Sequence, residues 1–336
     1  MGLIYNIDRL FEAVAARGHV CVGLDTCADY VPQRERQKAA DDAEAVLAFN
    51  RALIDAAFDT AACFKVQIAY YEEMGIDGLR AYSQTLKYIR KKGGLAIADI
   101  KRGDIADTAA RYAKAHFSGD FEADFVTISP YMGMDACEPW LTFAREKGKG
   151  AFVLMRTSNK GMRDFQYLEI SEKSEQTSVK KENITGNTEQ LAADGSSVNR
   201  QKSAVNENTK RVYHVLGDKL AVLAEQYKGG CGYGAFGAVV GCTERDEAAE
   251  IRKNYPSLFF LIPGYGVQGG GAKDAALLLR DGNGGVVNAS RSVITAWQGA
   301  ADRENLAADK VDNLFAAEAA RSAAIKMRDE IREELK

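Results

Sequence analysis

The sequence contains few of the residues that build metal sites and disulfide frameworks. Only three of the 336 residues are histidine, and His19, His116 and His214 lie far apart along the chain. The six cysteines include no pair with CxxC spacing. A histidine-based metal site and a Ser-His-Asp triad are therefore disfavoured. We expect the cysteines to be reduced structural residues of a cytosolic protein.

Long runs of one kind of residue are missing as well. No segment approaches the roughly 18 consecutive apolar residues of a membrane span, and no extended basic run accompanies the net charge of −3. We therefore expect neither a membrane nor a nucleic acid as a partner. The segment 1–19 carries acidic residues and lacks the layout of a signal peptide. We expect it to form an ordinary first helix, and the protein to be cytoplasmic.

Short apolar runs, rich in β-branched residues, alternate with helical patterns along the chain. The runs are continuous rather than alternating, which is typical of parallel strands covered by helices on both faces. They lie at 19–25, 63–67, 95–101, 125–129, 151–156, 238–242, 258–263 and 285–289, and the helical patterns at 39–60, 70–92, 105–117, 134–147, 212–227, 244–255, 273–280 and 305–335. Eight β-then-α units predict an α/β protein with a (β/α)8 TIM barrel, formed by a single domain over residues 1–336. The alternative is a doubly wound open sheet, but CVGLDTCADY lacks the GxGxxG expected after its first strand.

One segment interrupts this alternation after the fifth predicted strand. Residues 168–212 contain no aromatic side chain and are rich in Ser, Asn, Thr, Gln, Glu and Lys. Such a composition buries too little apolar surface to offset the entropy of ordering the backbone. We therefore predict a polar, low-complexity insertion over about 168–212.

Charged residues gather where predicted strands end. Asp25 ends the first strand, Lys65 lies in the second, and Asp99 and Lys101 end the third, in the stretch IADIKRGDIADT. The i, i+2 spacing of Asp99 and Lys101 places both side chains on one face of the strand, toward the barrel mouth where active sites lie. Asp104 follows at the expected start of the next helix, where a carboxylate suits the helix N-terminus.

These charges have a structural and a catalytic interpretation. Charges at a buried strand end cost free energy unless they are paired or used. Asp99, Lys101 and Asp104 could form only an ion-pair network, with Lys65 as a strand lysine that reaches solvent. Alternatively, the carboxylates hold a lysine in its protonated form, because nearby opposite charge favours the charged state. A protonated lysine held in a site is a proton donor.

The segment DIKRGDIADTAARYA resembles the signature of the orotidine 5'-monophosphate decarboxylase family, in particular its longer bacterial branch. Five further segments match that family in order along the chain: CVGLDTC, CFKVQIAYYE, MRTSNKG followed by DFQ, IPGYGVQGGG and VVNASRSV. The resemblance implies catalysis by Lys65, Asp99, Lys101 and Asp104. The substrate-binding residues that it implies are Asp25 and Thr108 for the ribose, Ser158 for the pyrimidine, Gln268 and Arg291 for the phosphate, and Pro263 and Ser290 beside them.

The last two segments also suit a phosphate on physical grounds. The final two βα loops of a barrel are its usual phosphate-binding place. The glycines between 264 and 271 let backbone N–H groups approach an anion, and Arg291 can bind it bidentately.

The resemblance implies conversion of orotidine 5'-monophosphate to UMP and CO2 in de novo pyrimidine biosynthesis, without metal or cofactor. An intermediate like a vinyl carbanion at C6 has no ring position to accept its charge, so preorganised charges must stabilise it. By resemblance, Lys101 protonates C6 and Asp99 lies near the substrate carboxylate. Asp104 and Thr108 are expected to share a helix face by their i, i+4 spacing and to reach the neighbouring subunit's site, which implies a homodimer.

Three other functions stay open. Sugar-phosphate decarboxylases and aldol-type synthases share an Asp-x-Lys strand but generally stabilise an enediolate with a metal. A class I aldolase needs a lysine of lowered pKa, and the carboxylates beside Lys101 act in the opposite direction. An inactivated barrel would bind nucleotide without turnover, although all four charged positions are present.

Overall fold

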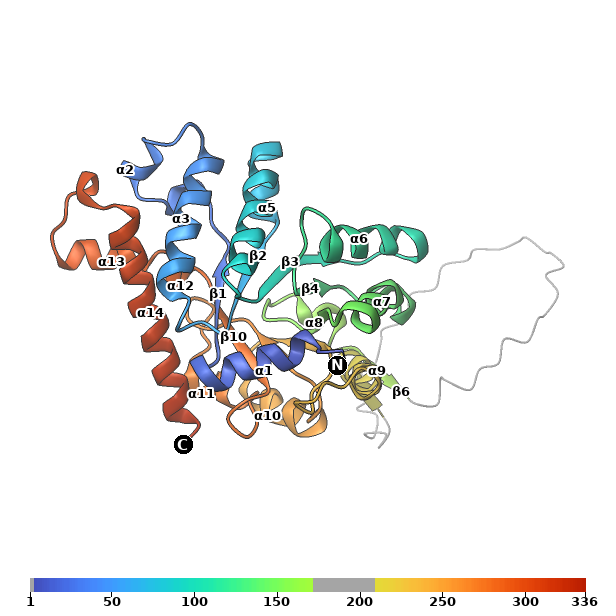
Figure 1. Ribbon diagram of the computed structural model, residues 1–336. Helices are drawn as coiled ribbons and strands as arrows, with labels where there is room; N and C mark the ends of the chain where they lie inside the picture. Colours follow the sequence, from blue (N-terminus) through green and yellow to red (C-terminus); the bar gives the residue numbers. More distant parts are fainter. Residues whose placement is uncertain (1–2, 172–208) are drawn as a thin grey trace, which may run out of the picture.

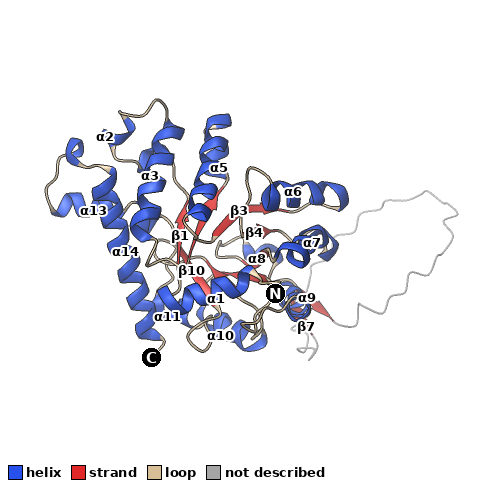
Figure 2. Ribbon diagram, viewed as in Figure 1, coloured by secondary structure: helices blue, strands red, loops and turns tan. Residues whose placement is uncertain are grey.

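The computed structural model describes residues 3–171 and 209–336. Within these ranges, parallel strands close into a barrel in the order β1-β10-β9-β8-β5-β4-β3-β2, and helices cover its outside (Figures 1 and 2). The predicted (β/α)8 barrel is confirmed, and the open doubly wound sheet is wrong because the first and last barrel strands pair with each other. The strands are β1 (Val20–Leu24), β2 (Cys63–Gln67), β3 (Ala96–Arg102), β4 (Phe125–Ile128), β5 (Gly150–Arg156), β8 (Phe236–Val240), β9 (Phe260–Ile262) and β10 (Gly285–Ala289).

The continuous apolar runs located these strands closely. β2 and β10 coincide with the predicted ranges, whereas β8 begins and ends two residues before its predicted range. Every residue of β1, β8 and β10 is buried. This burial agrees with strands covered on both faces, where no alternation of polar residues is required.

The helices match most of the predicted patterns and differ clearly at three places. α11 ends at Ala276, four residues before the end of the predicted range 273–280. The predicted helix 70–92 is divided into α4 and α5, because Gly75 adopts a φ of +70°. The predicted final helix begins only at Asn313, where the Asp312 carboxylate accepts the Phe315 N–H at 2.9 Å and caps the helix. The helices are α1 (Asn6–Arg17), α2 (Gln33–Arg36), α3 (Asp42–Ala57), α4 (Ala69–Glu72), α5 (Gly75–Lys91), α6 (Ala106–Ser118), α7 (Glu138–Lys147), α8 (Met162–Phe165), α9 (Val212–Gln226), α10 (Arg245–Asn254), α11 (Ala272–Ala276), α12 (Arg291–Ile294), α13 (Ala296–Arg303) and α14 (Asn313–Glu334).

The N-terminal helix α1 closes one end of the barrel, where the strands begin. Leu10 and Val14 are buried in one apolar cluster with Phe125 and Phe152, which lie near the starts of β4 and β5. The Asn6 amide donates to the Asp124 carbonyl at 3.2 Å and fixes the start of the helix against β4. Since side chains fill this end, a ligand cavity must lie at the opposite end.

The ends of the predicted insertion pair with each other. β6 (Glu169–Ser171) and β7 (Thr209–Arg211) form an antiparallel two-stranded sheet apart from the barrel. Residues 172–208, most of the predicted insertion, lie outside the described residues. A single domain with a polar insertion stays a prediction.

All six cysteines are free thiols, and Cys21, Cys63, Cys137 and Cys242 are buried. Burial raises the pKa of the Cys242 thiol to about 11, so this thiol is protonated at neutral pH and packs as a small apolar group. Among residues 3–171 and 209–336, no helix has the length and apolar character needed to cross a membrane.

Mild acid is expected to destabilise the fold through His116 on α6. This side chain is only 3% exposed, and burial, with a smaller effect of the Arg102 charge, lowers its pKa to about 4. In the unfolded chain a histidine titrates near 6.5. Between these values only the unfolded state binds the proton, so the free energy of unfolding decreases as pH falls, by about 3 kcal/mol in total. Urea unfolding between pH 7 and 4 measures this decrease.

The matched variant is His116→Leu, which cannot titrate. It should show a shallower decrease over the same pH range, whatever its stability at pH 7. Equal pH dependence in the variant and the parent would contradict the assignment.

Candidate active site

A cavity opens at the carboxyl ends of the barrel strands, opposite α1. Its volume is about 600 Å³, within the range of sites that hold a small organic ligand. Strand ends and βα loops from all around the barrel contribute to its walls. The predicted residues that line it are Asp25, Lys65, Asp99, Lys101, Ser158, Pro263, Gln268, Ser290 and Arg291.

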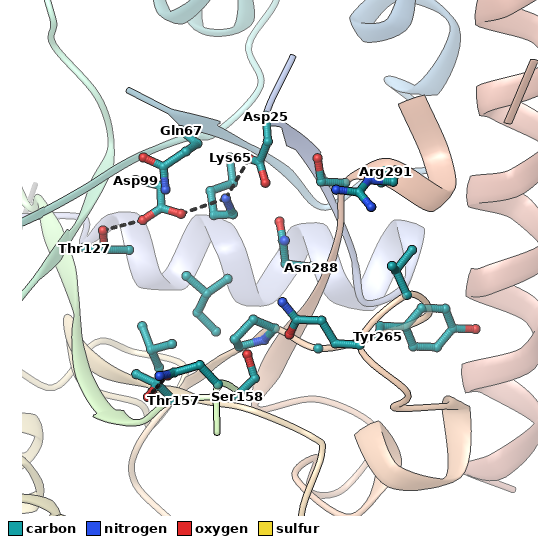
Figure 3. Close-up of a pocket in the computed structure, with 18 of the residues that line it drawn as sticks. Asp25, Lys65, Gln67, Asp99, Thr127, Thr157, Ser158, Tyr265, Asn288 and Arg291 are labelled. Atoms are coloured by element: carbon teal, nitrogen blue, oxygen red, sulfur yellow. Dashed lines mark hydrogen bonds and ion pairs between the residues drawn. The ribbon is translucent and has the colours of Figure 1, made fainter. Parts of the chain in front are cut away.

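One wall carries a chain of alternating charges (Figure 3). Lys65 Nζ lies 3.1 Å from Asp25 Oδ1 and 2.7 Å from Asp99 Oδ2. Asp99 Oδ1 in turn lies 2.6 Å from Lys101 Nζ. Lys65 and Asp99 are each 5% exposed, whereas the Lys101 side chain is 48% exposed and faces the cavity. The charge chain therefore ends in an accessible ammonium group.

The charges in this wall keep one another ionised. Burial by itself lowers the pKa of Lys65, but the charges of Asp25 and Asp99 outweigh it and raise that pKa above its ordinary value. Burial by itself raises the pKa of Asp99, but Lys65 and then Lys101 outweigh it and hold that pKa well below its usual range. Removing one member leaves a buried charge without its partner, which is strongly unfavourable. The wall is thus a fixed array of charges rather than a neutral hydrogen-bonded one.

Asp104 and Thr108 lie outside this cavity. The Asp104 carboxylate accepts the Ile105 N–H at 2.8 Å, and Thr108 is exposed on α6. Their expected common helix face is wrong, because α6 begins only at Ala106, which has a φ of +47°. This left-handed residue turns the backbone between Asp104 and the helix.

The opposite wall is formed by the loop after β5, which presents Ser158 to the cavity (Figure 3). The Gln166 amide holds this loop from behind. Gln166 Oε1 accepts the Thr157 N–H, and Gln166 Nε2 donates to the Thr157 hydroxyl, both at 2.9 Å. Gln166 is the glutamine of the DFQ segment, so the sequence marked the residue although not its contact.

The third side of the cavity has the features of an anion site. Gly264 and Gly266 adopt φ values of +101° and +80°, which glycine tolerates without strain. Arg291 begins α12 at the cavity edge, and within the described part of the chain no carboxylate pairs with its guanidinium. Tyr265 from the same loop donates to Glu330 of α14 at 2.6 Å. An unpaired arginine beside a glycine loop can bind a phosphate bidentately.

The cavity is also lined by residues that the sequence did not point to, and two of these lie on barrel strands beside the charged wall. Asn288 lies on β10 between the charged wall and the Ser158 loop, and Thr127 lies on β4 beside Asp99 (Figure 3). Each is a polar residue inside a buried apolar run, GVVNA and FVTIS. A buried polar residue near the carboxyl end of a barrel strand is the signal that could have found them.

Among residues 3–171 and 209–336, no group of three or more His, Cys, Asp or Glu side chains is placed to hold a metal ion. The cavity offers a ligand fixed charges at one wall and a glycine loop with Arg291 at another. This combination is typical of (β/α)8 barrels that hold an anionic ligand between a glycine loop and fixed charges at the strand ends.

Comparison with known proteins specifies the class further. The model of the orotidine 5'-phosphate decarboxylase / HUMPS family matches residues 18–215, and the chain belongs to this family. It is 48% identical over 326 residues to the orotidine 5'-phosphate decarboxylase of Clostridium perfringens strain SM101, covering 97% of this chain and 98% of the relative. The corresponding protein of Clostridium tetani is 44% identical and covers 97% of each chain.

A solved structure shows the same architecture. The structure of Leishmania donovani OMP decarboxylase superposes with a TM-score of 0.66 at 27% identity, covering 99% of both chains. The family model ends at residue 215, before the Gly264 loop and Arg291. The full-length relatives extend the similarity across this anion site.

Proposed function

We propose that this protein converts orotidine 5'-monophosphate to UMP and CO2, as a step of de novo pyrimidine biosynthesis. Its class, a carboxy-lyase, follows from the family and from the names of its relatives. The observation that carries the proposal is the charge chain from Asp25 to Lys101, which faces the anion loop across one cavity. A nucleotide with an acidic base and a phosphate needs the charge chain for its base and the anion loop for its phosphate.

The chemistry assigned to the charged wall is proton delivery. Loss of CO2 leaves an electron pair at C6 of the pyrimidine, and Lys101 Nζ is the exposed end of the charge chain. We assign Lys101 as the proton donor to C6 and Asp99 as its partner near the departing carboxylate. Lys65 and Asp25 hold Asp99 ionised and in place. The stabilisation comes from charges fixed before the reaction, so the proposal requires no cofactor.

The other lining residues orient the substrate. Ser158, held by the Thr157–Gln166 pair, is assigned to the pyrimidine, and Asp25 to the ribose. Gln268 and Arg291 are assigned to the phosphate, next to Pro263 and Ser290. Binding energy from the remote phosphate then helps to hold the base against Lys101.

We further propose a homodimer whose sites include Asp104 and Thr108 of the other subunit. Both residues lie outside their own cavity. Exposed apolar side chains lie beside Asp104 in the chain, at Ile105, and in the loop after β4, at Tyr131, whose ring lies 6.4 Å from that of Phe165. Ile105 is 52% exposed, Tyr131 83% and Phe165 63%. Their loops are adjacent, since the Ser129 N–H donates to the Arg102 carbonyl at 2.8 Å. Exposed apolar residues gathered in one region are typical of a protein interface. A cytoplasmic location completes the proposal, since six free thiols suit a reducing compartment.

Mixing two inactive variants tests the shared site. Lys101→Ala removes the proton donor of one subunit's own cavity, and Asp104→Ala removes the contribution to the neighbour. In a mixed dimer one cavity carries both defects and the other carries none. Subunit exchange between equal amounts should therefore restore about a quarter of the wild-type activity.

Two results bear on that experiment. A mixture that stays as inactive as its parts, although mass spectrometry shows mixed dimers, would contradict the shared site. The control pair, Lys101→Ala with Lys65→Ala, places both defects in the subunit's own cavity. In a mixed dimer of this pair each cavity keeps one defect, because Lys65 and Lys101 of the same chain line one cavity, so no activity should be recovered.

The proposed reaction is tested by adding orotidine 5'-monophosphate in EDTA and following the loss of its ultraviolet absorbance. Release of UMP and CO2 in equal amounts is the expected result. Binding of UMP without turnover by a folded dimer would favour the inactivated-barrel interpretation. Turnover only of sugar phosphates would favour the sugar-phosphate branch.

A further inference from the structure

Strand β3 departs from regular geometry at the residue that ends the charge chain. Lys101 adopts a φ of +43°, a left-handed backbone conformation that residues other than glycine rarely adopt. The register of β3 against β4 shifts between Ala98 and Arg102, as in a β-bulge. The simple i, i+2 argument therefore does not explain how Lys101 reaches Asp99. Something must hold this backbone in place.

The Thr127 hydroxyl on β4 occupies the centre of the bulge. Thr127 Oγ1 accepts the N–H groups of Ile100 and Lys101, both at 3.0 Å. The same hydroxyl donates to Asp99 Oδ1 at 2.8 Å. One donated and two accepted bonds use the whole hydrogen-bonding capacity of a hydroxyl. Thr127 is 1% exposed, so the protein and not solvent supplies the partners of this hydroxyl.

The three bonds of Thr127 act on the catalytic pair from both sides. The bonds from the Ile100 and Lys101 N–H groups fix the backbone of the bulge, and the Lys101 side chain projects from this bulge. The bond to Asp99 fixes the carboxylate that the Lys101 ammonium contacts, because Oδ1 receives both Thr127 and Lys101 while Oδ2 receives Lys65. Figure 3 shows Thr127 bonded to Asp99, on the side of that carboxylate away from Lys65 and Asp25. Rotation of the Asp99 carboxylate would break contacts at both oxygens.

We infer that Thr127 is a positioning residue for proton delivery: its hydroxyl sets the bulge at Lys101 and the orientation of Asp99, and so the location of the Lys101 ammonium group. This inference rests on the proposed decarboxylation. Thr127 acts through other residues and belongs to none of the groups assigned to the ribose, the pyrimidine or the phosphate. Its removal should therefore affect the chemical step and leave substrate binding largely intact.

The test compares Thr127→Val with Thr127→Ser. Valine keeps the β-branched shape and removes the hydroxyl, whereas serine keeps the hydroxyl. We expect T127V to lower kcat by about 100-fold, since small misplacements of a reacting group cost that much, with KM changed by less than about threefold. T127S should recover kcat to within about fivefold of wild type, because the hydroxyl alone is required.

A matched control separates positioning from general destabilisation. Thr60 is also 1% exposed, and its hydroxyl donates to the Ala57 carbonyl at 3.0 Å, away from the cavity. Thr60→Val should lower the melting temperature but leave kcat within about twofold of wild type. If T127V is too unstable to assay, Thr127→Ala carries the same expectation. T127V with kcat close to wild type, or T60V with an equal loss of kcat, would overturn the inference.

Hydrogen–deuterium exchange tests whether Thr127 holds the backbone at Ile100 and Lys101, and it requires no measurement of activity. In T127V the amides of Ile100 and Lys101 lose their acceptor, so a peptide covering 96–102 should exchange at least about tenfold faster than in wild type. The same peptide of T127S and T60V should exchange at nearly the wild-type rate. Wild type without turnover of orotidine 5'-monophosphate would end the proposed function. Even then, unchanged exchange in T127V would show that Thr127 does not hold the bulge, and faster exchange would show that it does.

Discussion

Replacing Lys101 with alanine is expected to lower kcat by at least about 10⁴-fold, because the substitution removes both the proton donor and a positive charge at the reacting carbon. The fold should survive the change. The Lys101 side chain is 48% exposed, and Asp99 keeps Lys65 at 2.7 Å and the Thr127 hydroxyl at 2.8 Å as partners. Single-turnover assays with orotidine 5'-monophosphate, beside a thermal unfolding curve, measure both expectations.

A second variant distinguishes charge from proton transfer. Lys101→Arg retains a positive charge beside Asp99, but guanidinium stays protonated at all ordinary pH values and is a poor proton donor. We expect it to be nearly as inactive as the alanine variant. Lys91→Ala, on the exposed end of α5, is the control and should keep full activity. An active arginine variant would mean that Lys101 acts through its charge alone.

Replacing Arg291 with alanine is expected to lower kcat/KM by about 10³-fold, mainly through KM. The guanidinium faces the cavity beside the Gly264 loop, and two charge-assisted hydrogen bonds to a phosphate are worth about this much. The result is measured with saturating and limiting orotidine 5'-monophosphate, so that kcat and KM are separated.

The same variant has an internal control in the substrate. Orotidine, which lacks the phosphate, has nothing for Arg291 to contact, so the variant and wild type should turn it over at the same slow rate. Arg303→Ala, on the exposed end of α13, should leave both substrates unaffected. Equal losses with orotidine and with the nucleotide would place Arg291 elsewhere in the mechanism.

The barrel and the charged wall could be predicted from local patterns. Apolar runs such as 63–67 and 285–289 coincided with strands, because a parallel strand covered on both faces leaves a continuous signal in the sequence. Asp99 and Lys101 were found because charges at a strand end are costly unless used. The structure divides the predicted helix 70–92 into α4 and α5 at Gly75. The apolar pattern did not indicate this break, because periodicity reports helix faces and not φ angles.

Residues whose importance depends on a partner strand were not found in this way. Thr127 matters because β4 pairs with a bulged β3, and Asn288 because β10 closes the barrel beside β1. Neither contact has a local signature beyond one polar residue in an apolar run. Asp104 and Thr108 failed in the opposite way, since their spacing indicated a shared helix face that the left-handed Ala106 removes.

The sequence by itself determined the number of strands in the barrel, their order along the chain, and the residue types that gather at their carboxyl ends. These properties follow from burial, which each segment encodes independently. Tertiary structure alone decided that Asp25 and Asp99 flank Lys65, that Arg291 lies at the edge of the same cavity, and that Thr127 holds the bulge at Lys101. Such contacts join elements tens of residues apart, and they depend on strand register and barrel closure, which local composition does not specify.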